Sequence, residues 1–187
     1  MTDKEQLIQQ ISVAMGKTKV LELTKIVQKN NFKLRDLIDL TFDGNKKLAF
    51  RAAWLLENVF LQRPESYLTD IEYLIGNFAN VTNGSCQRHY AKIAMHLTSP
   101  KALPAIQQKL QDIDMEIVVN QCFEWLIDPK VLIAVKAFGA ETIFNLRHRY
   151  PWVADELSEQ LEYLMRNGSP AIQSRGKKLL NYLHPSA

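Results

Sequence analysis

One cysteine and two histidines lie within one predicted helix, where they could together bind a transition metal. Cys86 and His89 are three residues apart, and His96 follows two turns later on nearly the same face. Thiolate and imidazole are ligands that zinc prefers, but a structural zinc site takes four ligands at short spacings. No second CxxC or HxxxH motif supplies the rest. We therefore expect these side chains to pack the helix, and the sequence predicts no metal site and no cofactor.

The segment 147–152, Arg-His-Arg-Tyr-Pro-Trp, combines cations with aromatic rings. Such a combination could hold a phosphate or stack on a base. The segment also ends a predicted helix, where basic side chains offset the helix dipole and bind free carbonyl groups. Capping is the role that we expect. Four further lysines are expected on solvated turns and edges rather than in a phosphate site: Lys46, Lys47, Lys177 and Lys178.

The sequence lacks the motifs that would assign a catalytic activity. It has no GxSxG elbow, Walker loop or HExxH pair. Neither Cys86 nor Cys122 has a histidine and an acid arranged to activate its thiol. No catalytic residue and no enzymatic activity are predicted.

Length and composition are those of an ordinary globular domain. The chain has 187 residues, 47% of them hydrophobic, and only seven glycines and seven prolines, which are few for a β-sandwich or barrel. The longest nearly uncharged run, 131–142, is far shorter than the roughly 20 apolar residues of a membrane span. No membrane segment is predicted. The first residues lack the features of a signal peptide and cysteines are few, so we expect a reducing, cytoplasmic compartment.

Charge is distributed unevenly along the chain. Residues 1–63 carry 11 basic and 7 acidic side chains, 64–128 carry 4 and 8, and 129–187 carry 8 and 5. A nucleic-acid binder more often has one continuous basic stripe, because its affinity comes from neutralising many phosphates. The pattern favours a protein partner over nucleic acid.

Turn signals recur along the chain at intervals of 40, 45 and 39 residues. A period of this length predicts a stack of helix pairs, none of which buries its apolar face alone. The signals are Asp43-Gly44, Asn83-Gly84, Asp128-Pro129 and Asn167-Gly168. In Asp128-Pro129 and Ser169-Pro170 a capping side chain precedes a proline, which predicts helix starts at Pro129 and Pro170.

The helices around these turns have two apolar patterns. Before a turn, one apolar stripe is spaced for a single buried face, most clearly at 68–78 and again at 153–164. After the first turn, the segment 48–60 has two adjacent apolar rows, which predicts an inner helix covered on both sides. A helix pair over 4–15 and 19–30 is expected to cap the stack, and 101–113 is expected to hold a short additional helix.

Three segments resemble the start of the second helix of a HEAT repeat: 50–53, 135–138 and 174–177. That family favours an aspartate in the turn and an arginine or lysine early in this helix. Asp43 with Arg51 and Asp128 with Lys136 match this pattern, each pair eight residues apart. Arg88 fits only if its turn is three residues shorter, and asparagines replace the aspartates at 83 and 167.

The resemblance covers the chain from about residue 34 to its end. It implies an all-α fold, a right-handed α-α superhelix of the HEAT or armadillo type with about 10 to 11 helices. We expect one solenoid domain over 1–187, with a capping helix pair in 1–32 and about four HEAT-like pairs in 33–184.

The recurring basic residues allow two interpretations. They could form a basic ladder along a concave binding face, or each could pair with a turn aspartate or a neighbouring repeat and hold the stack in register. Charges that are buried need partners, so we expect the structural role. The four positions are Arg51, Arg88, Lys136 and Arg175.

HEAT-like proteins mostly present a concave surface to other proteins, so the resemblance implies a non-catalytic interaction module whose protein partner is unidentified. The alternative is a nucleic-acid-binding or DNA-repair protein similar to the HEAT-like alkylpurine DNA glycosylases. Those enzymes cradle DNA against a strongly basic face with tryptophans; this chain has Trp54, Trp125 and Trp152 but lacks the basicity. HEAT-repeat lyases that attach bilins share the architecture, but no motif of this chain indicates that activity.

Overall fold

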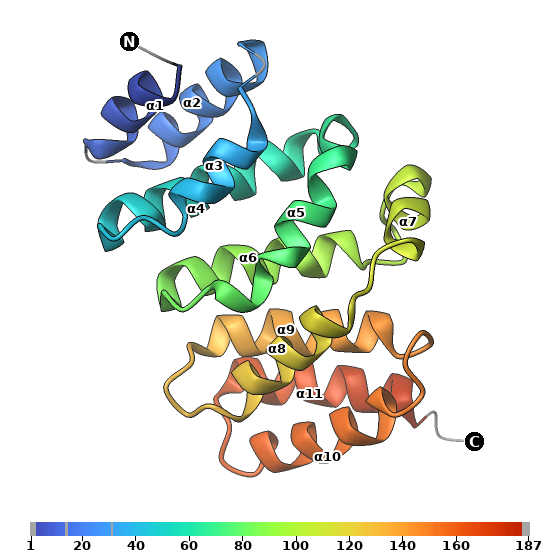
Figure 1. Cartoon of the computed structure of the whole chain (residues 1–187). Helices are drawn as coiled ribbons and strands as arrows, with labels where there is room; N and C mark the ends of the chain where they lie inside the picture. The colour runs from blue at the N-terminus through green and yellow to red at the C-terminus, as the bar shows by residue number, and fades with distance from the viewer. Residues whose placement is uncertain (1–2, 14, 31, 185–187) are drawn as a thin grey trace. The chain divides into compact units, whose positions relative to one another are not determined.

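Every regular element that the structure describes is helical. The computed structural model describes residues 3–13, 15–30 and 32–184 and contains eleven α-helices and no strand within them (Figure 1). The all-α prediction and the expected number of helices are confirmed. None of the described helices combines the length and the apolar character that crossing a bilayer requires.

The α-helices follow one another with short connections, two of which contain 3-10 turns. The helices are α1 (Asp3–Ser12), α2 (Lys17–Lys29), α3 (Leu34–Leu40), α4 (Lys46–Gln62), α5 (Ile71–Gly76), α6 (Gly84–Leu97), α7 (Pro104–Gln111), α8 (Glu116–Ile127), α9 (Ile133–Leu146), α10 (Val153–Met165) and α11 (Pro170–Leu183). The 3-10 segments η1 (Pro64–Asp70) and η2 (Phe78–Asn80) flank α5.

Contacts between Cα atoms divide the chain into two compact units, Met1–Ile93 (unit 1) and Ala94–Ala187 (unit 2). In unit 1, α4 packs against α1, α2 and α3. In unit 2, α9 packs against α8, α10 and α11. Each unit therefore has one central helix surrounded by others. The expectation that 1–187 is a single solenoid domain stays a prediction.

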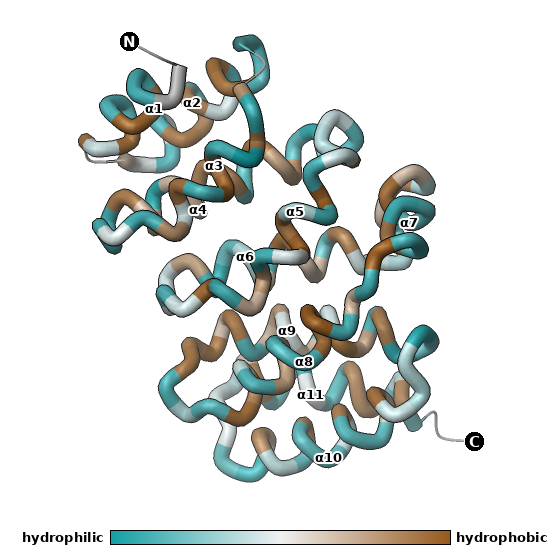
Figure 2. Tube along the Cα trace, in the orientation of Figure 1, coloured by the Kyte–Doolittle hydropathy of each residue, from teal (hydrophilic) through white to brown (hydrophobic). Residues whose placement is uncertain are grey.

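α4 is central in unit 1 because it is apolar on two adjacent sides. Asn45 caps it, its side-chain oxygen accepting from the backbone N–H groups of Lys47 and Leu48 at 3.1 and 3.3 Å. Figure 2 shows the hydrophobic residues that recur along the helix. Both predicted rows are buried, and burying each large aliphatic side chain contributes about 1.5–3 kcal/mol. The rows are Leu48, Ala52, Leu55 and Val59, and Ala49, Ala53, Leu56 and Phe60.

The predicted helix over 68–78 is broken into η1, α5 and η2. Tyr67 has non-helical dihedrals (φ −124°, ψ 24°), and the chain leaves α5 at Asn77, whose side-chain nitrogen donates to the carbonyl of Tyr73 at 2.9 Å. Ile71 and Phe78 are nevertheless buried as the stripe predicts. The apolar pattern thus identified the buried side chains but not the breaks between them.

One of the two predicted helix starts is confirmed and the other is wrong. α11 begins at Pro170, and the hydroxyl of Ser169 accepts from the N–H of Ile172 at 3.5 Å. α9 begins at Ile133 rather than Pro129. The carboxylate of Asp128 accepts from the N–H of Lys130 at 2.8 Å, which closes a local turn instead of capping a helix. The expected additional helix within 101–113 is present as α7.

Candidate functional site

Arg51 of α4 binds the end of another helix. Its guanidinium donates to the carbonyls of Ile11 and Ser12 at 3.2 and 2.6 Å. These carbonyls belong to the last turn of α1 and have no partner within their own helix. The turn carboxylate of Asp43 accepts from the N–H of Asn45 at 2.7 Å. Arg51 therefore links α4 to α1, and Asp43 organises its own turn.

Lys136 of α9 has the same kind of partner in unit 2. The side chain is buried, and its ammonium donates to the carbonyl of Leu126 in the last turn of α8 at 2.7 Å. Burial lowers the pKa of Lys136, and the nearby carboxylate of Asp128 acts in the opposite direction. A buried ammonium therefore caps α8 from the neighbouring helix.

Arg175 and Arg88 differ from these two residues and from each other. Arg175 of α11 forms an ion pair with Glu141 of α9. Arg88 of α6 is exposed, and in the described parts of the chain it has no hydrogen-bond or ion-pair partner. Three of the four predicted basic positions therefore contact other helices of their own unit, and Arg88 alone projects from its helix without such a contact.

The segment 147–152 is tied to the connection between α7 and α8. Arg149 donates to the carbonyls of Leu110 and Ile113 at 2.7 and 2.6 Å. The hydroxyl of Tyr150 donates to the carboxylate of Asp114 and accepts from the N–H of Met115, both at 3.0 Å. The segment also caps the helix that it ends, as expected, because Arg147 donates to the carbonyl of Phe144 in the last turn of α9 at 2.8 Å. Its contacts therefore go both to α9 and to α7 with its following loop.

Cys86, His89 and His96, which were considered for metal binding, do not form a ligand group in the described part of the chain. Cys86 is buried, and burial raises the pKa of its thiol to about 11. His96 is exposed. Among the residues that the structure describes, no three His, Cys, Asp or Glu side chains form a group that could hold a metal ion.

His89 belongs instead to a buried polar cluster that connects α6 with α4. Its Nδ1 lies 2.7 Å from Oε2 of Glu57, and Nζ of Lys92 donates to Oε1 of Glu57 at 2.5 Å. Burial alone would raise the pKa of Glu57, but the hydrogen bonds and charges of His89 and Lys92 hold it below its ordinary value. Glu57 was not among the predicted site residues; its one signal in the sequence is a carboxylate within the apolar rows of α4.

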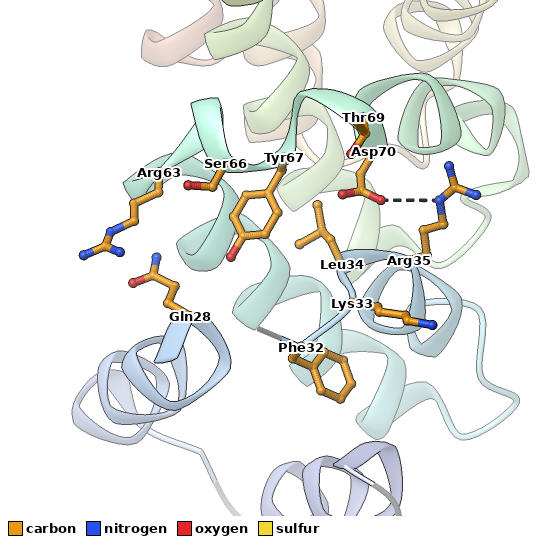
Figure 3. Close-up of a pocket in the computed structure, with 10 residues that line it drawn as sticks. All are labelled: Gln28, Phe32, Lys33, Leu34, Arg35, Arg63, Ser66, Tyr67, Thr69 and Asp70. Carbon is orange, nitrogen blue, oxygen red and sulfur yellow. Dashed lines mark hydrogen bonds and ion pairs between the residues drawn. The ribbon is translucent and has the colours of Figure 1, made fainter. Parts of the chain in front are cut away.

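Unit 1 contains a polar pocket of about 610 Å³, shown in Figure 3. Its walls come from the end of α2, the α2–α3 connection with the start of α3, and the segment 63–70 after α4. The pocket is lined by three cations, Lys33, Arg35 and Arg63, and by one carboxylate, Asp70. Asp70 lies 3.3 Å from Nε of Arg35 and is therefore already paired.

Unit 2 contains an open groove of about 720 Å³ between the chain after α6, α7, α9 and α11. Buried leucines from four segments lie at its base: Leu97, Leu110, Leu146 and Leu179. Phe144 and Tyr182 also line it, with ring centroids 6.0 Å apart, and Tyr182 is 62% exposed. This combination of an apolar base and an accessible aromatic ring is suited to binding an apolar side chain.

Cations surround this apolar groove. Lys101, Arg147 and Lys178 line it, and the guanidinium of Arg147 lies 3.8 Å from the ring centroid of Phe144. Among the described residues that line the groove, the one carboxylate is Glu141, which is paired with Arg175. The rim of the groove is therefore positively charged. The sequence did not indicate either the groove or the pocket, because their residues are far apart in the chain.

Comparisons with known proteins identify a family and no individual relative. Neither the curated proteins nor the solved structures contain a match to this chain. A family model described as a HEAT repeat domain matches residues 6–183, which also takes in the helices that we expected to form a cap outside the repeats. The chain belongs to the HEAT repeat domain family.

Proposed function

We propose that this HEAT repeat protein is a non-catalytic protein-interaction module, and that the groove of unit 2 binds an acidic segment of a partner protein. The observation that carries the proposal is the apolar base of this groove, with cations around it. HEAT repeats are helical scaffolds commonly used in protein interaction, which agrees with such a role.

The groove favours a particular kind of segment. Its leucine base and the rings of Phe144 and Tyr182 accept a leucine or aromatic side chain, whose burial supplies affinity. Lys101 and Lys178 are exposed on the rim, where they attract carboxylates and repel basic segments. The matching partner is a short segment in which one or two large apolar residues are flanked by aspartate or glutamate.

The contacts of the basic residues favour this function over nucleic-acid binding. Arg51 and Lys136 donate to carbonyl groups, and Arg175 pairs with Glu141. Cations held in this way neutralise few phosphates, whereas affinity for DNA grows with the number neutralised. We also propose that the chain functions without a cofactor and in the cytoplasm.

Fluorescence polarisation with labelled 12-residue peptides tests the proposal. Each acidic peptide carries one leucine or phenylalanine, and its counterpart has lysine at every acidic position. We expect the acidic peptides to bind and the lysine peptides not to. Lys178→Glu should weaken binding by about tenfold, because a charge reversal on the rim replaces attraction with repulsion. Tyr182→Ala should also weaken it, because a large exposed ring is lost.

Lys177→Glu is the matched control, because Lys177 is exposed on the same helix but does not line the groove. Equal losses in the two lysine variants would show that only net charge matters and would overturn the proposal. Binding of lysine peptides as tight as that of acidic peptides would overturn it as well. A salt titration with duplex DNA completes the test: tight DNA binding that weakens steeply with salt would favour the nucleic-acid alternative.

A further inference from the structure

We propose that the polar pocket of unit 1 is a binding site for the phosphoryl group of an organic phosphate monoester. The pocket lies wholly within unit 1 and shares no residue with the groove of unit 2. The inference therefore stands independently of the proposed partner segment.

The first argument is the charge of the pocket. Of its three cations, Arg35 is paired with Asp70. Within the described residues, Lys33 and Arg63 form no ion pair. Figure 3 shows Lys33 on the side of Arg35 and Arg63 on the side of Tyr67, so these two cations do not meet at one place. Arg63 is therefore the cation without a counter-charge that is available beside Tyr67, and a guanidinium binds phosphoryl oxygens through two donors at once.

The second argument is the set of hydrogen-bond donors. Ser66, Tyr67 and Thr69 line the pocket, and in the described part of the chain the hydroxyl of Tyr67 has no hydrogen-bond partner. Burial raises the pKa of Tyr67, so this hydroxyl is a protonated donor at neutral pH. Arginine and hydroxyl donors together satisfy the acceptor oxygens of a phosphoryl group.

The arrangement of these donors divides the pocket into two parts. Figure 3 shows Arg63, Ser66 and Tyr67 on the side of Gln28, and the Arg35–Asp70 pair on the opposite side. Because Arg35 is already paired with Asp70, whose carboxylate would repel an anion, we assign the phosphoryl group to the side of Arg63 and Tyr67.

The size of the pocket indicates an esterified phosphate rather than free inorganic phosphate. A volume of about 610 Å³ is within the range of sites for small organic molecules. Phe32 and Leu34 also line the pocket and offer apolar surface to a carbon skeleton. Recognition of the phosphoryl group comes from the cations and hydroxyls, and the remaining volume holds the organic part.

Isothermal titration calorimetry with phenyl phosphate, inorganic phosphate and a seven-residue phosphoserine peptide tests this inference. We expect phenyl phosphate to bind, and to bind more tightly than inorganic phosphate. If the peptide binds at least as tightly as phenyl phosphate, the natural ligand is a phosphorylated protein side chain. If phenyl phosphate binds more tightly than the peptide, the natural ligand is a small phosphate ester. Both orders support the phosphoryl site.

Two variants and a control locate the binding. Arg63→Gln should weaken phenyl phosphate binding by about tenfold, and Tyr67→Phe by several-fold, because each removes a donor to the phosphoryl oxygens. Arg88→Gln is the matched control, since Arg88 is an exposed arginine of unit 1 outside the pocket. Unchanged thermal unfolding midpoints would show that the variants are folded. If one of them is unfolded, Ser66→Ala provides the replacement measurement, because Ser66 lies on the same side of the pocket.

Three results would overturn the inference. The first is the absence of phenyl phosphate binding at millimolar concentration. The second is an equal loss in Arg63→Gln and Arg88→Gln, which would indicate non-specific attraction by net charge. The third is binding of citrate or sulfate as tight as that of phenyl phosphate, which would indicate a general anion surface.

Discussion

Nδ1 of His89 lies 2.7 Å from Oε2 of Glu57, so α6 and α4 are joined through buried polar atoms of unit 1. Lys92 donates to the other carboxylate oxygen of Glu57 at 2.5 Å. Glu57 thus holds two potential cations of α6 against α4. Removing the shared carboxylate leaves both of them without their acceptor.

Glu57→Gln should lower the free energy of unfolding at pH 7 by about 1–3 kcal/mol, because hydrogen bonds to a buried charge are lost. The pKa of Glu57 in the folded chain lies below its ordinary value of 4.5. As pH falls, the unfolded chain therefore takes up the proton first. The contribution of the carboxylate is complete above about pH 4.5, shrinks below it, and disappears once the pH falls through the folded pKa.

Urea unfolding of the wild-type protein and Glu57→Gln between pH 7 and pH 3 measures this dependence. The difference between their unfolding free energies should narrow as the pH falls. A difference that stays constant or widens would contradict the lowered pKa of Glu57.

Arg51→Met should loosen α1. The substitution removes both hydrogen bonds to the carbonyls of Ile11 and Ser12, while the aliphatic part of the side chain is kept. We expect amide hydrogen exchange to accelerate in α1 more than in α3. Arg88→Met is the control and should leave exchange unchanged, because Arg88 has no such contact in the described residues. Equal acceleration in the two variants would refute the capping role of Arg51.

Arg149→Lys should lower the free energy of unfolding by about 1–3 kcal/mol. One ammonium cannot reproduce the two separate donor nitrogens that bind the carbonyls of Leu110 and Ile113, so one of these two charge-assisted hydrogen bonds is lost. His148→Gln, at the exposed neighbouring position, should change stability by less than about 0.5 kcal/mol. Chemical denaturation of both variants measures the difference, and equal stabilities would show that the two carbonyl contacts contribute little.

Gly168→Ala should destabilise the turn between α10 and α11. A Cβ atom at Gly168 would lie 2.4 Å from the carbonyl oxygen of Leu164, which is a backbone atom and cannot rotate away. We expect a loss of about 1–3 kcal/mol from the required backbone shift. Gly44→Ala is the matched control, because no atom lies within 4 Å of a Cβ at Gly44. Thermal unfolding midpoints compare the two; a midpoint for Gly168→Ala as high as that of Gly44→Ala would contradict the close approach.

Both thiols should be unreactive in the folded protein. Cys86 and Cys122 are buried, and burial raises the pKa of both thiols, that of Cys86 to about 11. Thiolate is the reactive form, so a colorimetric thiol reagent should label neither cysteine at neutral pH and both in guanidinium chloride. Rapid labelling of the folded chain would show that one of them is accessible.

Local sequence determined most of the helices of this protein. The two apolar rows of α4 lie next to one another because residues three and four apart share a helix face, whatever surrounds the helix. Ser169-Pro170 starts α11 because a hydroxyl cap and a proline at the first helical position act within one turn. The same local reasoning failed at Asp128, whose side chain closes a turn with Lys130 instead, and over 68–78, where the predicted helix is divided into η1, α5 and η2.

Only the tertiary structure decided the partners of the charged residues and the location of the sites. The sequence identified Arg51, Lys136 and Arg175 as recurring cations, but two of them bind main-chain carbonyl groups, which every residue has and which no pattern distinguishes. Glu57 meets His89 across 32 positions, and the pocket brings Gln28 close to Arg63. Helix packing determines these proximities, because side chains distant in the chain meet only when their helices dock.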